Sequence, residues 1–75
     1  MQDRIRAVMA QIFNVEAGSI TADSSPETIE RWDSLRHMQL VLAMEEEFGI
    51  TFSDDDIPEL LSLRAIEESI GQLAP

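Results

Sequence analysis

Residues 33–49 read DSLRHMQLVLAMEEEFG. This stretch predicts a helix over Ser34–Phe48, because Asp33 is a favoured N-cap residue and Gly49 is favoured just past the end of a helix. Its apolar residues cover more than one stripe, which indicates a central helix in contact with several neighbours. The expected core face consists of Leu40, Val41, Met44 and Phe48. A second apolar strip, nearer the surface, consists of Leu35, Met38 and Leu42.

The segments on either side of this helix also show helical spacing. Near Asp3 to Asn14, apolar residues recur at steps of three and four, at Ile5, Val8, Met9, Ile12 and Phe13. Ser62 is a favoured cap for a last helix that carries Leu63, Ile66, Ile70 and Leu73. Before it, Pro58 favours a short helix over Ile57–Leu61, because proline fits the first turn of a helix.

The segment from Val15 to Asp33 is rich in Gly, Ser, Thr and Asp, a composition typical of loops. Its 19 residues make a long connection for so small a chain, and long loops are usually functional or disordered. A packed loop is expected here, because it contains the apolar anchors Ile20, Ile29 and Trp32.

Ile50–Phe52 alternates like a strand but has no partner strand, so it is interpreted as a connector. The sequence therefore predicts an all-α fold, a small four-helix bundle of three longer helices and one short helix. A long loop joins the first two helices, and residues 1–75 form a single domain.

The chain is strongly acidic. Its 75 residues carry a formal net charge of −10, from 15 acidic residues against five arginines, with no lysine. Such a surface repels nucleic acids and anionic membranes and favours partners with basic patches. The alternative is that the acidity only keeps a small domain in solution.

The sequence also bears on the compartment. It has no cysteine, which excludes disulfides and zinc–thiolate sites and fits a reducing environment. Charges at Asp3, Arg4 and Arg6 interrupt any signal peptide, and no apolar run is long enough to span a bilayer. We therefore expect a soluble, cytoplasmic and monomeric protein that binds neither nucleic acid nor membrane.

Ser34 is the residue at which chemistry is most readily placed. It lies where the long loop ends and the central helix begins, so its hydroxyl is expected to be accessible. A phosphate attached there would meet free backbone N–H groups and the positive end of the helix dipole, a gain of up to about 1 kcal/mol. Asp-Ser is common at the start of a helix, so from these residues alone the simpler interpretation is that Ser34 helps Asp33 to cap the helix.

The wider pattern resembles the acyl carrier protein family. Asp33-Ser34-Leu35 is followed by an apolar helix that ends in Met44-Glu45-Glu46-Glu47-Phe48-Gly49-Ile50, in a chain of matching size and acidity. The resemblance covers nearly the whole chain. It implies that a phosphopantetheinyl transferase attaches 4'-phosphopantetheine from coenzyme A to Ser34. The thiol of that arm then holds an acyl or aminoacyl group as a thioester, in a carrier that is not itself an enzyme.

The resemblance also implies roles for neighbouring positions. Asp33 and Leu35 match positions that contact the transferase, and Asp33 would face its basic, metal-containing site while also capping the helix. Leu35, Met38 and Leu42 match exposed apolar positions that partners contact, with core packing as the alternative. The run Glu45, Glu46 and Glu47 matches an acidic recognition patch for enzymes with basic patches, with a merely solvated face as the alternative.

Four positions depart from the pattern of carriers for fatty-acid synthesis. Trp32 stands where many of them have a small residue, so it shields the arm or pins the loop. Arg36 and His37 place positive or titratable groups where such carriers are acidic or neutral, and Gln39 replaces a recognition glutamate. These departures favour a carrier of a specialised pathway or of an amino acid.

Other functions are less well supported by the residues. A Ser34–His37 hydrolase would need a third group behind the histidine, but Asp33 adjoins Ser34 instead, and so small a core leaves no pocket. Asp54–Asp56 are consecutive and lack the alternation and glycine of a calcium loop. We therefore predict no catalytic residue and no metal site. The second hypothesis is an unmodified acidic helical adaptor that binds a basic protein.

Overall fold

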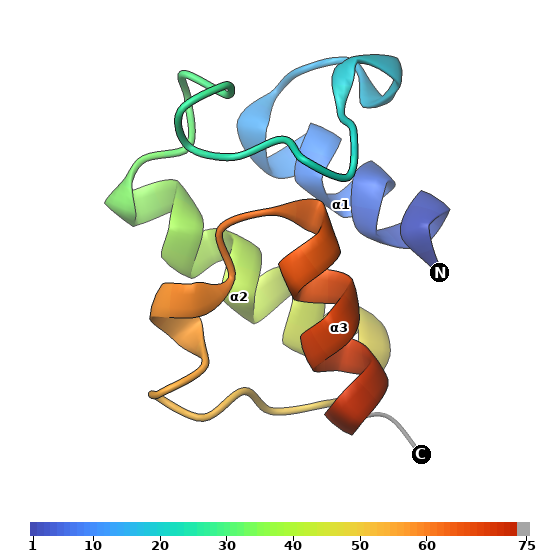
Figure 1. Ribbon diagram of the computed structural model, residues 1–75, viewed down its shortest axis with the longest axis vertical. Helices are drawn as coiled ribbons and strands as arrows, with labels where there is room; N and C mark the ends of the chain where they lie inside the picture. Colours follow the sequence, from blue (N-terminus) through green and yellow to red (C-terminus); the bar gives the residue numbers. More distant parts are fainter. Residues whose placement is uncertain (74–75) are drawn as a thin grey trace.

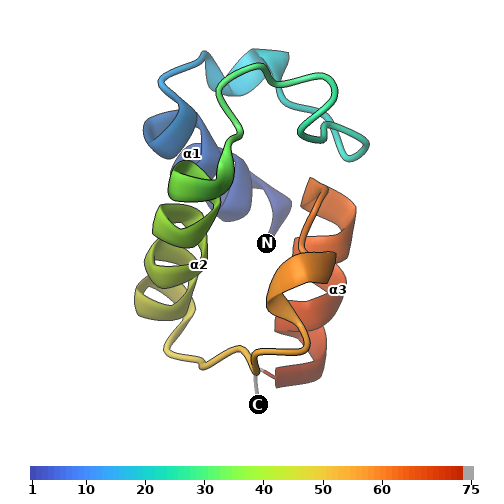
Figure 2. The same ribbon diagram turned by 90° about the vertical axis from the view of Figure 1, so that its left-hand side faces the viewer.

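The computed structural model describes residues 1–73. It contains three α-helices, α1 (Gln2–Phe13), α2 (Ser34–Phe48) and α3 (Leu63–Leu73), and two 3-10 turns, η1 (Ala17–Ser19) and η2 (Ile57–Glu59). Helix α1 packs against both α2 and α3. The segment from α1 to α2 crosses one end of the bundle and the connector from α2 to η2 crosses the other (Figures 1 and 2). The predicted all-helical bundle is confirmed.

Local capping interactions set the helix ends. At α2, Gly49 adopts the left-handed conformation with φ 65°, and the bounds Ser34–Phe48 agree with the prediction. Helix α1 ends one residue before the prediction because Asn14 is left-handed, with φ 54°. The predicted cap of α3 is confirmed, since Ser62 Oγ accepts a hydrogen bond from the Ala65 N–H at 3.0 Å.

The short predicted helix begins at Ile57 as expected but ends at Glu59 rather than Leu61. It is a single 3-10 turn, because Leu60 leaves the helical region at φ −82° and ψ 57°. Leu60 is nearly fully buried, whereas Leu61 remains 46% exposed beside it. Leu60 therefore anchors η2 to the core, and Leu61 stays on the surface.

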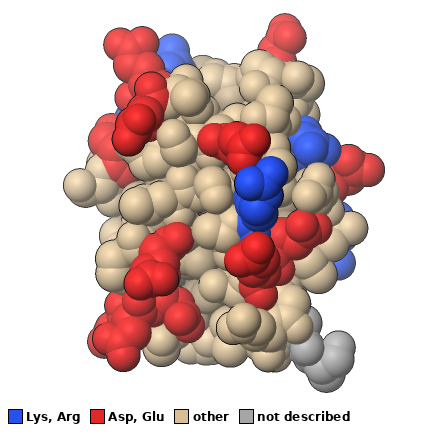
Figure 3. Space-filling view, viewed as in Figure 1, with Lys and Arg blue, Asp and Glu red and all other residues tan. Residues whose placement is uncertain are grey.

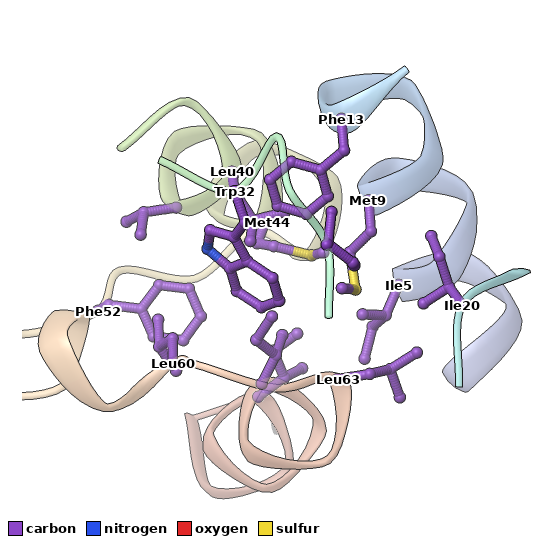
Figure 4. Close-up of a cluster of buried hydrophobic side chains, with 14 residues drawn as sticks. Ile5, Met9, Phe13, Ile20, Trp32, Leu40, Met44, Phe52, Leu60 and Leu63 are labelled. Carbon is purple, nitrogen blue, oxygen red and sulfur yellow. The ribbon is translucent and has the colours of Figure 1, made fainter. Parts of the chain in front are cut away.

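One hydrophobic core joins all the helices (Figure 4). Trp32 lies at its centre with the Phe13 ring beside it, the two ring centroids 4.9 Å apart. The predicted core face of α2 is confirmed for Leu40, Val41 and Met44. Phe48 packs against this core but is only half-buried: it lies at the end of α2, with the Arg4 guanidinium 4.4 Å from its ring centroid.

The long loop is packed, as predicted. Its anchors Ile20, Ile29 and Trp32 are all buried in the core. Ser24 is buried as well, and its hydroxyl accepts a hydrogen bond from the Thr21 N–H at 2.8 Å. These interactions hold the whole segment that leads to Ser34, so the start of α2 is well defined.

The segment after α2 is a connector, as predicted, and residues 1–73 contain no strand. Phe52 is buried, and its N–H donates a hydrogen bond to Glu45 Oε2 at 2.8 Å. None of the helices within residues 1–73 has the length and apolar character needed to cross a membrane.

Candidate functional site

Ser34 is exposed at the first position of α2. Its hydroxyl takes part in no hydrogen bond with the residues that the structure describes. The hydroxyls of five other serines do form such bonds, at Ser19, Ser24, Ser25, Ser53 and Ser62. Ser34 therefore has an available hydroxyl, and the helix dipole favours an anion beside it.

Asp33 caps α2 and pairs with Arg36. Its Oδ1 accepts a hydrogen bond from the Arg36 N–H at 2.8 Å, so the predicted N-cap is confirmed. Its Oδ2 lies 2.7 Å from Arg36 Nη1, in an ion pair whose side chains are 53% and 39% exposed. The carboxylate next to Ser34 is thus accessible but already has a cation beside it.

Trp32 and His37 form a hydrogen-bonded bridge across the start of α2. The Trp32 Nε1–H donates to His37 Nδ1 at 2.9 Å, and His37 Nε2 lies 2.8 Å from the backbone oxygen of Ile57 in η2. Because an indole only donates, Nδ1 must be the acceptor, and Nε2 then carries the proton that faces Ile57. The tryptophan therefore pins the loop, one of its two predicted roles.

This bridge decides against the hydrolase hypothesis. Both ring nitrogens of His37 are occupied, one by Trp32 and the other by Ile57, so neither is directed to Ser34 as a base. The His37 side chain is half-buried. No sequence signal reveals this contact, since its partner in η2 lies 20 positions away.

An apolar groove of about 630 Å³ lies beside Ser34, between α2 and η2. Its walls include the side chains of Trp32 and Met38 on one side and Ile57, Pro58 and Leu61 on the other. Sequence reasoning missed Pro58 and Leu61 as site residues. The sequence signal that could have identified them is that both side chains are apolar and belong to a segment too short to bury both.

The apolar strip predicted on α2 is exposed. Leu35 is 69% exposed, Leu42 61% and Met38 44%. These side chains are therefore not core residues, which removes the alternative of ordinary packing. They lie at offsets of one, four and eight residues from Ser34, and the spacing of Leu35, Met38 and Leu42 by three and four places them on one face of α2.

The three glutamates at the end of α2 have different surroundings. Glu45 Oε2 accepts the Phe52 N–H, so this carboxylate fastens the connector. Glu47 pairs with Arg4 of α1 at 3.0 Å. Glu46 is exposed and forms no ion pair or hydrogen bond within the part of the chain that the structure describes. Within the run Glu45–Glu47, Glu46 is thus the one carboxylate without a partner in residues 1–73.

Acidic side chains are not confined to one patch on the face shown in Figure 3. Figure 3 shows acidic side chains over several parts of one face, with few arginines among them. Arg4, Arg6, Arg36 and Arg64 each pair with a carboxylate. No three metal-ligating side chains come together anywhere in residues 1–73.

Comparisons with known proteins agree with this geometry. A sequence model of the family described as "Phosphopantetheine attachment site" matches residues 3–70. An acyl carrier protein of Treponema pallidum is 43% identical over 67 residues, 89% of this chain and 86% of that protein. Acyl carrier protein 2 of Pseudomonas aeruginosa is 31% identical over 75 residues, 100% of this chain and 95% of that protein.

A solved structure shows the same fold. The solution NMR structure of a holo acyl carrier protein from Geobacter metallireducens gives a TM-score of 0.83 at 24% identity, over 95% of this chain and 82% of that chain. The surroundings of Ser34 fit a covalent phosphopantetheine group, because the hydroxyl is exposed and unbonded beside an apolar groove. The chain therefore belongs to the phosphopantetheine-attachment family of acyl carrier proteins, as a carrier with a covalent 4'-phosphopantetheine cofactor and no catalytic activity of its own.

Proposed function

We propose that Ser34 is the residue that carries the phosphopantetheine group and that the protein delivers acyl or aminoacyl thioesters to partner enzymes. The observation that carries this proposal is the free, exposed hydroxyl at the first position of α2. The arm would supply a thiol, which the chain itself lacks because it has no cysteine. Residues 1–75 would act as one carrier domain.

The transferase would contact Asp33 and Leu35 on either side of Ser34. Asp33 is half exposed, so its pair with Arg36 can exchange for a basic or metal-bound partner group. Leu35 is the most exposed large apolar residue of the described chain, at 69%. Burying it in a complex would favour docking of the transferase directly over the hydroxyl.

Loading and transfer enzymes would dock on the strip of Leu35, Met38 and Leu42. Its exposure is the supporting observation, since such a row of apolar side chains gains free energy when a partner removes it from water. Glu46 would steer a basic patch of the partner toward the far end of α2, because it has no internal cation to satisfy it. Glu45 and Glu47 would contribute less, since each already has a partner.

We further propose that the carrier serves a specialised or aminoacyl pathway rather than bulk fatty-acid synthesis. Support comes from Arg36, which places a cation next to Ser34, and from Gln39, which is exposed and uncharged on the recognition helix. A partner that binds this helix would need a surface compatible with the positive charge of Arg36 near the arm. A cytoplasmic location would give the transferase access to coenzyme A, and the high negative charge would oppose self-association.

One experiment distinguishes the carrier from the unmodified acidic adaptor. The protein is incubated with coenzyme A, Mg²⁺ and a broad-specificity phosphopantetheinyl transferase, and the intact mass is measured. A carrier gains the mass of one arm, and its new thiol can be acylated to a thioester that neutral hydroxylamine releases. An adaptor shows no mass change, which would contradict the proposal.

A further inference from the structure

The hydrogen-bonded bridge between Trp32 and His37 spans the modified position. Trp32 precedes Ser34 by two residues and His37 follows it by three, so the bridge closes a short stretch of backbone around the hydroxyl. Through His37 Nε2 and the Ile57 oxygen, the same ring also holds η2 against the start of α2. One imidazole thus joins the end of the loop, α2 and the far wall of the groove.

We propose that neutral His37 is a positioning residue for Ser34, and that protonation of its Nδ1 releases the loop end at Trp32 while the Nε2–H keeps its hydrogen bond to the Ile57 oxygen. The Trp32 indole N–H can only donate. Once Nδ1 also carries a proton, two donors face each other where the structure has a bond of 2.9 Å. Trp32 is only 5% exposed, so its N–H would lose its partner without gaining free access to water.

Few other groups around His37 can change charge when its Nδ1 is protonated. From the loop, the groove is lined by Pro26 and Trp32, and from the η2 side by Ile57, Pro58 and Leu61, none of which titrates. Behind Trp32 lies the Phe13 ring of α1, which is also uncharged. Asp33 is the one other titratable group that lines the groove, and Arg36 pairs with its carboxylate.

The expected consequence is a Ser34 junction that loosens on the side of Trp32 as the pH falls. Histidine is the side chain that ordinarily changes charge in this range, whereas carboxylates ordinarily titrate around pH 4. Loosening the junction would change how readily the transferase reaches Ser34. This inference rests on the proposed role of Ser34, but its bridge can be measured in the unmodified protein.

The chain offers ideal probes, because it contains one tryptophan and one histidine. Two-dimensional ¹H–¹⁵N NMR spectra of the unmodified protein are recorded from about pH 8 to about pH 5.5, a window that avoids most carboxylate titration. We expect the Trp32 indole N–H and the amide signals of η2 to shift together with the ring protons of His37. His37→Gln, which does not titrate, should abolish these coupled shifts.

The rate of phosphopantetheine attachment is then compared between wild type and His37→Gln over the same pH range. The ratio of the two rates should change along the His37 titration curve, which a merely structural residue would not produce. Trp32→Phe is the second variant: it removes the indole donor, so its attachment rate should no longer change along the titration of His37, although its η2 signals still follow that titration through the Ile57 contact. If the His37 ring titrates while the Trp32 indole signal stays fixed, or if His37→Gln shows the same shifts, the inference is wrong. A chain that shows the coupled shifts but accepts no arm would instead contradict the proposed function.

Discussion

Arg4 of α1 donates three hydrogen bonds to Glu47 of α2: its Nη2 lies 2.9 Å from the Glu47 backbone oxygen and 3.0 Å from Glu47 Oε2, and its Nε lies 3.1 Å from the same Oε2. The same guanidinium covers the Phe48 ring. Glu47 is therefore part of the contact between two helices, whereas the adjacent Glu46 points into solvent with no internal partner in residues 1–73. Neighbouring glutamates thus have separable roles.

The first prediction separates these two glutamates. Glu46→Lys should slow association with a loading enzyme and flatten its dependence on salt, with little effect on folding. Glu47→Gln should instead lower the free energy of unfolding by about 0.2–1 kcal/mol, the usual contribution of an exposed pair. Association rates at several ionic strengths and urea unfolding measure the two effects. A wild-type association rate for Glu46→Lys would mean that recognition does not depend on Glu46.

The second prediction tests the docking strip. Met38→Glu should weaken loading or transfer while the domain stays folded, because Met38 is 44% exposed. Leu40→Ala is the matched control on the buried face, and it should cost about 2–5 kcal/mol of stability. Circular dichroism, urea unfolding and a thioester-transfer assay distinguish the two. If Met38→Glu unfolds the protein, Met38 belongs to the core; if it transfers normally, partners approach from another side.

The third prediction concerns the start of α2. Asp33→Ala should destabilise the protein by about 0.5–2 kcal/mol, because the Arg36 N–H loses its capping acceptor. Asp33→Asn keeps a capping oxygen but removes the charge, so it should retain most of the stability. If the transferase modifies Ser34 in both folded variants at the wild-type rate, Asp33 has no role in transferase recognition.

The fourth prediction follows from the net charge of −10, which arises from 15 acidic residues and five arginines. Moderate salt or millimolar Mg²⁺ should raise the melting temperature, since both screen repulsion between carboxylates. The double variant Asp54→Asn/Asp55→Asn removes two exposed charges and should reduce this salt dependence. A melting temperature that salt does not move would show that the charges are too widely spread to oppose folding.

Local sequence signals predicted the bounds of α2 and the cap of α3. An N-cap aspartate, a C-terminal glycine and a capping serine act within a few residues of themselves, so their effect is readable from the chain. Phe48 was assigned to the core by helical spacing, but spacing does not reveal how much of a helix end its neighbours cover. There Arg4 shields the ring instead of burying it fully.

The site divides in the same way. Ser34 and the apolar strip could be predicted because they lie on one helix, where spacing along the chain gives their relative positions. The motif around Ser34 also resembled a known family. The His37 contact with η2 could not be predicted, because it depends on how the η2 turn packs in three dimensions. The distinct surroundings of Glu45, Glu46 and Glu47 depend in the same way on Phe52 and Arg4, which come from other segments.

The most direct test of the account is the site of modification. Wild type, Ser34→Ala and the control Ser53→Ala are each treated with coenzyme A, Mg²⁺ and the transferase. Mass spectrometry then measures the intact mass of each protein, and peptide mapping locates the modified residue. Ser53 is a suitable control because its hydroxyl is exposed but bonded to Asp56 at 3.0 Å. We predict one added phosphopantetheine on wild type and Ser53→Ala, located at Ser34, and none on Ser34→Ala. An arm that still appears on Ser34→Ala, at Ser24, Ser25, Ser53 or elsewhere, would contradict the account.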